Sequence, residues 1–135
     1  MSKYKELSKK NKYYIPKEDY LTAIHYSLRY PLWLAELKDA RDTSIAIRYD
    51  KDKVQVSPSD DMIVDAAVRA AELSDKIALI DGVLKQCGDD LEYYLRLGVC
   101  YGLTFDQLKG KNMPCERDTY YLMRRHYYYE LVKRI

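Results

Sequence analysis

Apolar residues at helical spacing begin at Pro16, where a proline followed by two acids suits a first helical turn. The next apolar positions recur every three or four residues, at Leu21, Ile24 and Leu28. Pro31 interrupts them, because a proline inside a helix lacks an N–H donor and clashes with the preceding turn. The pattern predicts a helix that ends or kinks near Arg29 and a second helical segment that runs to about Arg41.

Residues 42–58 lose this helical period. β-favouring residues alternate there in two pairs, Ile45 with Ile47 and Val54 with Val56. We interpret the segment as a connector, with a short hairpin around residues 50–53 as one form of it.

A long heptad seam follows, after possible helix caps at residues 59–61. Its apolar positions step alternately by three and four residues, at Ile63, Ala66, Ala70, Leu73, Ile77, Ile80 and Leu84. Such a seam buries a narrow stripe against another long helix. That helix is either the N-terminal helix of the same chain or a second copy, so we expect a monomer or a homodimer paired through residues 63–84. Gly88 ends the predicted helix.

The sequence after Gly88 contains the start and stop signals of three further helices. Asp89 or Asp90 can cap the first, and Gly102 stands where a helix end favours a left-handed residue. Thr104 and Gln107 form a capping-box pattern, which predicts a short helix from Phe105 to about Lys109.

Pro114 then predicts a final helix that begins between residues 115 and 117 and continues to the C-terminus. Its inner stripe should hold Tyr120, Met123, Tyr127 and Leu131. A short helix, a polar turn and a longer basic helix are the arrangement that presents a recognition helix to a DNA major groove.

These elements predict an all-α fold. Its N-terminal part is a helical hairpin built on a long helix, and its C-terminal part is a three-helix, helix-turn-helix unit. The expected division is a basic flexible arm at residues 1–14, a packing or oligomerisation segment at 15–88 and a DNA-binding domain at 89–135.

The formal net charge of +2 hides an uneven distribution. Residues 36–92 carry eight basic and fourteen acidic side chains, whereas residues 109–135 carry seven basic and three acidic ones. Positive charge gathered at one place favours contact with phosphates, because neutralising phosphates releases counterions. The C-terminal segment is therefore the candidate for a nucleic-acid surface.

Side chains expected on the outer side of the final helix and in the turn before it are the candidate DNA contacts. Arginine can bind guanine through two hydrogen bonds, and tyrosine and lysine can hold phosphate oxygens. The candidates are Lys109, Lys111, Arg117, Asp118, Tyr121, Arg124 and Arg125. The alternative interpretation is a solvated amphipathic helix without a nucleic-acid partner.

The segment GLTFDQLKGKNMPCERDTYYLMRRHYYYELVKRI resembles the C-terminal helix-turn-helix of small phage-encoded transcriptional regulators of the RinA and ArpU type, which is itself similar to region four of bacterial sigma factors. The resemblance rests on the capped short helix, the opening at residues 114–120 and the Arg124–Arg125 pair followed by aromatic residues. The upstream stretch RYDKDKVQVSPSDD is similar to the linker of that group. One departure is the pair of acids, Glu116 and Asp118, at the start of the recognition helix.

The resemblance implies a sequence-specific regulator of phage or prophage genes that binds double-stranded promoter DNA. Contact with RNA polymerase is implied by the resemblance alone. Two rival functions share these elements: a DNA-packaging protein like a small terminase subunit, and a helical protein-interaction module. A ring of many copies would favour packaging, and a monomer or dimer would favour the regulator.

Other functional classes lack support in the sequence. It has no Gly-rich phosphate loop and no nucleophile motif, so we expect neither an enzyme nor a cofactor. His25 and His126 lie far apart, and the three cysteines form no CxxC pair, so we expect no metal site. Without a signal peptide or a membrane-length apolar run, a cytoplasmic location and no membrane partner are expected.

Overall fold

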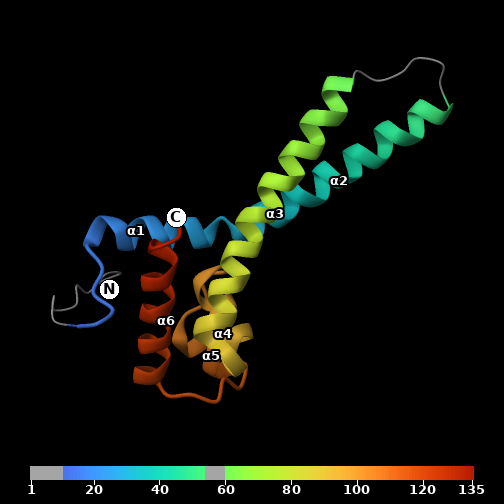
Figure 1. Cartoon of the computed structure of the whole chain (residues 1–135). Coiled ribbons are helices and arrows are strands. Elements are labelled where there is room, and N and C mark those ends of the chain that lie inside the picture. The colour runs from blue at the N-terminus through green and yellow to red at the C-terminus, as the bar shows by residue number, and fades with distance from the viewer. Residues whose placement is uncertain (1–10, 54–59) are drawn as a thin grey trace. The chain divides into compact units, whose positions relative to one another are not determined.

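A computed structural model describes residues 11–53 and 60–135, and most of these residues lie in helices (Figure 1). The elements are α1 (Lys17–Leu28), α2 (Tyr30–Lys53), α3 (Asp60–Gly88), the 3-10 turn η1 (Asp89–Leu91), α4 (Glu92–Val99), α5 (Phe105–Gly110) and α6 (Arg117–Val132). No β-strand occurs in the described ranges, and the predicted all-α class is confirmed.

The break between the first two helices lies where the prolines predict it. Pro16 is the cap residue of α1, and α1 ends at Leu28. α2 begins at Tyr30, so Pro31 occupies a first-turn position where its missing N–H leaves no helical bond unmade.

The predicted connector at residues 42–58 is wrong for its described part. α2 continues without interruption to Lys53, which contradicts both the expected end near Arg41 and the hairpin around residues 50–53. β-propensity depends on sheet packing, and the penalty for a β-branched residue in a helix is small, so two isoleucines do not end a helix that is already formed. The alternation at residues 54 and 56 lies outside the described residues.

The chain divides into two compact units, one made of α1 with residues 79–135 and the other of residues 31–78. The sequence-based domain boundary at residue 88 stays a prediction. In the structure α1 groups with the C-terminal helices.

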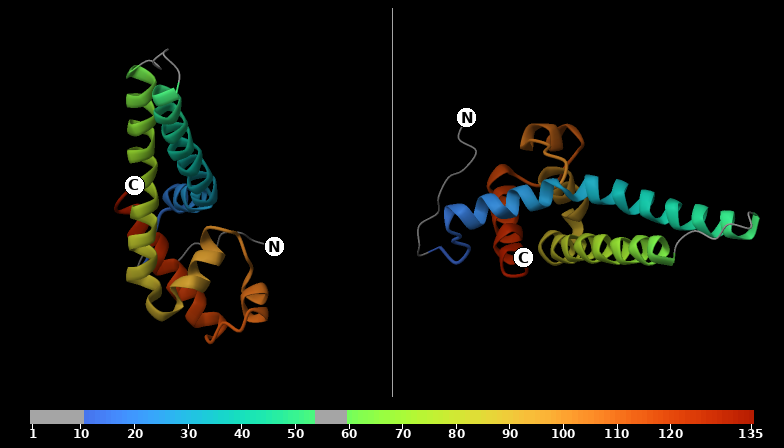
Figure 2. Two further views of the ribbon diagram at one scale, coloured as in Figure 1. Left: turned by 90° about the vertical axis from the view of Figure 1, so that its right-hand side faces the viewer. Right: turned by 90° about the horizontal axis from the view of Figure 1, so that it is seen from above.

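Residues 31–78 form a two-helix hairpin in which α2 and α3 lie side by side (Figure 2). Its buried apolar residues are Trp33, Leu37, Ala40, Leu73 and Ile77. The Lys76 ammonium lies 5.3 Å from the centre of the Trp33 ring, and Arg69 forms a 3.4 Å ion pair with Glu36. This part of the heptad seam therefore packs against α2 of the same chain, while the homodimer stays a prediction.

The other unit has a core rich in tyrosine. Its fully buried side chains include Ile80, Leu84, Leu95, Leu108, Tyr120, Tyr127, Tyr128 and Leu131. α1 lies across the C-terminal half of α6 (Figure 1), where the Tyr20 and Tyr128 rings meet edge to face at 5.2 Å. Rings of this size remove a large apolar area from water, and a buried tyrosine hydroxyl usually finds a hydrogen-bond partner.

Candidate nucleic-acid interface

The approach to the candidate interface is the turn between α4 and α5. Gly102 adopts φ +74°, the left-handed conformation predicted for this position. The Leu103 amide then donates a hydrogen bond to the Leu97 carbonyl at 3.1 Å. This reversal places α5 against α4.

α5 starts with the predicted capping box. The Gln107 amide donates to the Thr104 hydroxyl at 3.2 Å, and the Thr104 amide donates to the Gln107 side-chain oxygen at 2.8 Å. Two backbone donors that the helix itself cannot satisfy are thereby bonded. The cap fixes where a helix of only six residues begins.

Backbone and side-chain contacts hold the turn from α5 to α6 in one shape. Asn112 adopts φ +69°, and the Met113 amide donates to the Leu108 carbonyl at 3.2 Å. The Lys109 ammonium donates to the carbonyls of Met113 at 3.0 Å and Cys115 at 3.2 Å. Lys109, predicted as a phosphate contact, is exposed, but its ammonium is engaged in holding the turn. Lys111 is exposed as well.

The inner side of α6 packs on α5 as predicted. Tyr120 belongs to a buried cluster with Phe105, Leu108, Met113 and Cys115, and Met123 packs against that cluster while only partly buried. Further along the helix Tyr127 and Leu131 are fully buried. The predicted inner stripe is confirmed, and it sets the rotation of α6 about its axis.

The Tyr120 hydroxyl is buried and has no hydrogen-bond partner among the described residues. Burial raises the pKa of Tyr120 to about 12. The hydroxyl sits so close to Gly98 that a Cβ at this glycine would overlap it. α4 and α6 therefore touch where Gly98, which has no side chain, leaves room for the Tyr120 ring.

The outer side of the first half of α6 is open. Arg117, Asp118, Tyr121 and Leu122 are all exposed, and we call this set the α6 ridge. Arg117 lies 3.3 Å from the Asp106 carboxylate, with its guanidinium 4.6 Å from the centre of the Phe105 ring. An ion pair this exposed contributes little, so Arg117 can exchange Asp106 for another anion or a base edge.

Arg124 and Arg125 lie in a different environment, although Arg125 was predicted on the same outer side of the helix as Arg117, with Arg124 on the flank of that side. Arg124 is partly buried. Its guanidinium lies 5.8 Å from the centre of the Tyr121 ring and 5.7 Å from the centre of the Tyr128 ring. The Arg125 guanidinium lies 4.4 Å from the centre of the Tyr20 ring on α1. Of the predicted site residues, Arg117, Asp118 and Tyr121 are therefore exposed on one side of α6, and Lys111 is exposed in the turn before it.

The second half of α6 is tied to α1. Ser27 is buried, and its hydroxyl donates to the Ala23 carbonyl at 2.9 Å. The Tyr127 hydroxyl therefore donates to Ser27 across 2.8 Å. Burial raises the pKa of Tyr127 well above its ordinary value. Nothing in helical periodicity predicts this pairing, because its partners are 100 residues apart.

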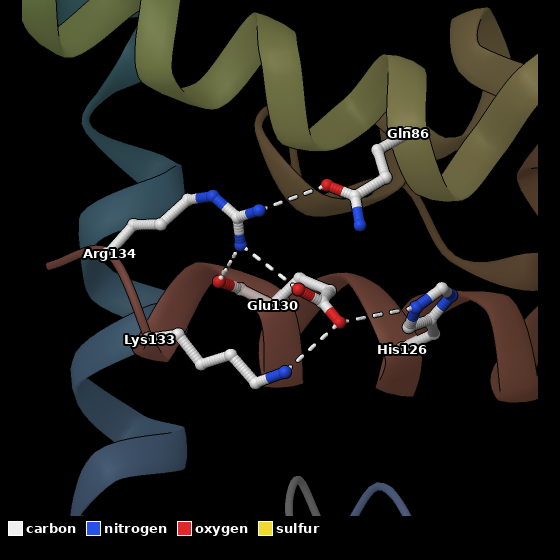
Figure 3. A network of polar contacts seen from close by, with 5 residues as sticks. All are labelled: Gln86, His126, Glu130, Lys133 and Arg134. Carbon is white, nitrogen blue, oxygen red and sulfur yellow. Dashed lines mark hydrogen bonds and ion pairs between the residues drawn. The ribbon is translucent and has the colours of Figure 1, made fainter.

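The C-terminal charges form a network of their own around Glu130 (Figure 3). Its carboxylate lies 3.0 Å from Arg134, 3.3 Å from Lys133 and 3.6 Å from His126. Arg134 also donates to the Gln86 side chain at 3.1 Å. The hydrogen bond from Arg134 is the main cause that holds the pKa of Glu130 below its ordinary value. The number of basic side chains in residues 109–135 thus overstates the positive charge that is available to bind phosphates.

Residues 11–14 were expected within a flexible arm, but Tyr13 lies on α6. Its ring stacks on His126 at 4.6 Å and meets Tyr129 at 5.6 Å. This part of the predicted arm is therefore packed on the second half of α6.

Two residues of the interface were missed from the sequence. Leu122 was not assigned a role, although it is an apolar residue on the polar side of the helix and 56% exposed. Tyr94 lies on α4 with its hydroxyl 3.3 Å from the Lys111 carbonyl, which adds a contact to the turn. A leucine outside the inner stripe was a visible signal, whereas the Tyr94 contact depends on tertiary structure.

The remaining candidate chemistry is sparse. Among the residues that the structure describes, no three His, Cys, Asp or Glu side chains gather in a metal-binding arrangement. Cys87, Cys100 and Cys115 are free, and burial raises the pKa of Cys87 to about 11 and of Cys100 to about 12. The described helices include none that combines the length and apolar character needed to cross a bilayer.

The α6 ridge and the turn before it are therefore the candidate site, because their side chains are exposed on a helix whose inner side is fixed. No protein-family model matches the chain, and no curated protein or solved structure shows significant similarity to it.

Proposed function

We propose that the chain binds double-stranded DNA sequence-specifically, with the first half of α6 in the major groove. One observation carries the proposal: Tyr120 locks the inner side of this half on α5, while the α6 ridge on its outer side is exposed. A recognition helix needs both properties, because base reading requires a fixed helix and side chains that can reach base edges.

The charges of the ridge suggest how the helix would lie. Lys111 and Tyr121 are exposed and can contact phosphates. Arg117 can bind guanine, and Asp118 can accept a hydrogen bond from the cytosine amino group. Glu116 and Asp118 repel phosphates, so we infer that this end of α6 faces base edges rather than the DNA backbone.

The resemblance to RinA and ArpU regulators supports a narrower proposal, a non-enzymatic transcriptional regulator of phage or prophage genes that acts in the cytoplasm. It also suggests contact with RNA polymerase.

Selection of bound sequences from random duplex DNA, repeated at two salt concentrations, tests the proposal. We expect enrichment of a sequence motif that persists at the higher salt, because base contacts depend less on counterion release than phosphate contacts do. Binding that disappears with salt and enriches no motif would contradict it.

A second candidate function has an observation of its own. In the hairpin unit Met62, Val64 and Val68 of α3 are at least half exposed. Exposed apolar side chains on one helix favour a protein-interaction or packaging role. Sizing of the purified chain separates the candidates: a ring of many copies favours packaging, and a monomer or dimer favours the regulator.

A further inference from the structure

Leu122 is an apolar residue within an otherwise polar ridge. Its side chain is 56% exposed, and the exposed Asp118 lies one turn before it on the same side of α6. The neighbouring Tyr121 is 38% exposed. By contrast, Leu131 on the same helix is fully buried, so the exposure of Leu122 is a property of its position on the helix.

The chemistry of a DNA groove offers one partner for such a side chain. Of the groups that base pairs present in the major groove, the C5-methyl of thymine is apolar, and the others are hydrogen-bond donors and acceptors. We propose that Leu122 packs against a thymine C5-methyl group in the bound duplex. This inference rests on the proposed function, since it assumes that the α6 ridge enters the groove.

A protein partner fits the ridge less well. Stable protein interfaces have an apolar core and bury about 800 Å² on each side. Here the exposed leucine has the exposed Asp118 one turn before it on the same side of α6, so a dry protein surface would have to cover a charged group. A major groove offers polar base edges beside the methyl group and accommodates both kinds of side chain.

The test compares a duplex with its uracil analogue, which lacks only the C5-methyl groups. The probe is the most enriched duplex from the selection described above, synthesised with thymine and with uracil in every thymine position. The parent chain should bind the uracil duplex about fourfold more weakly, the factor that corresponds to about 0.8 kcal/mol for one buried methyl group. Leu122→Ala should bind both duplexes equally.

Two further variants serve as controls. Leu34→Ala removes a leucine that is 37% exposed in the hairpin unit and should keep the parent's preference for thymine. Leu122→Met keeps an apolar side chain of similar size and should keep most of that preference. The melting temperature of each variant shows whether the fold is retained.

The outcomes separate this inference from the proposed function. Equal affinity of the parent chain for the two duplexes overturns the role of Leu122 and leaves DNA binding intact. A thymine preference that persists in Leu122→Ala also overturns it, because another residue then contacts the methyl group. Failure of the selection to enrich any motif overturns sequence-specific binding itself and this inference with it.

Discussion

The two halves of α6 use the same residue types for different purposes. In the first half, Tyr120 points into the core, and the opposite side carries Arg117 and Leu122 in contact with solvent. In the second half, Tyr127 and Tyr128 are both buried, and α1 covers the helix. A single helix is thus open on one side at its start and enclosed near its end.

The difference shows that position along α6 decides what an arginine can do. Arg117 pairs with Asp106 and lies over the Phe105 ring, but its side chain is 57% exposed, so less is lost when it turns to a new ligand. Arg125 lies on the Tyr20 ring, so leaving that contact costs cation–π energy. We therefore assign recognition to the first half of α6 and attachment to α1 to the second.

The substitution with the largest expected effect on stability lies on the inner side of the first half of α6. Tyr120→Ala should lower the free energy of unfolding by about 3 kcal/mol, because it leaves a cavity among Phe105, Leu108 and Met113. Tyr120→Phe should change stability little, because the hydroxyl it removes has no partner. Urea unfolding of the two variants checks both. A Tyr120→Ala variant as stable as the parent would contradict the packing.

Gly98→Ala should destabilise the chain by about 2 kcal/mol, because its Cβ would overlap the buried Tyr120 hydroxyl. The double variant with Tyr120→Phe should recover most of that loss, since the overlapping atom is gone. Urea unfolding of the four proteins in a double-mutant cycle measures this coupling. Additive effects would show that α4 and α6 do not meet at this point.

Two arginine substitutions distinguish the halves by stability. Arg125→Ala should lower the free energy of unfolding by about 1 kcal/mol through loss of the contact with Tyr20. Arg117→Ala should change it by less than about 0.5 kcal/mol, because a largely exposed side chain makes its contacts with Asp106 and the Phe105 ring. Thermal unfolding of the two variants measures this difference. Equal losses of stability would show that the two halves of α6 do not differ in this respect.

The smallest expected effect is a pH dependence of stability that comes from Glu130 near the end of α6. The pKa of Glu130 is lowered in the folded chain, so its contribution to stability is present above its ordinary pKa of 4.5 and is lost as pH falls through the folded value. The difference in melting temperature between the parent and Glu130→Gln should therefore shrink on acidification from pH 7. A difference that is constant down to pH 3 would show that the Arg134 contact contributes nothing.

Local signals predicted much of the C-terminal fold. The Thr104 cap, the left-handed Gly102 and the start of α6 after Pro114 each depend on neighbours within a few residues, and each is present. The extension of α2 to Lys53 was missed, because weak β-propensity was given priority over helix continuation.

The candidate site was predicted in part, because the sequence shows local signals but not contacts between distant helices. Helical periodicity separates the inner from the outer side of α6, so it identified Arg117 and Tyr121 as exposed. It does not reveal that α1 covers the second half, and Arg125 was therefore expected to be open. The role of Lys109 in the turn was also hidden, since its acceptors belong to backbone that only the fold brings close.

The most direct test of the central claim is a binding titration on the selected duplex at moderate salt, with the parent chain, Arg117→Ala and Arg41→Ala. Arg41 is an exposed arginine of the hairpin unit and controls for the loss of one charge. We predict that Arg117→Ala weakens binding by about 1–3 kcal/mol with an unchanged melting temperature, and that Arg41→Ala binds like the parent. Equal affinity of Arg117→Ala and the parent would contradict the placement of the α6 ridge in the groove.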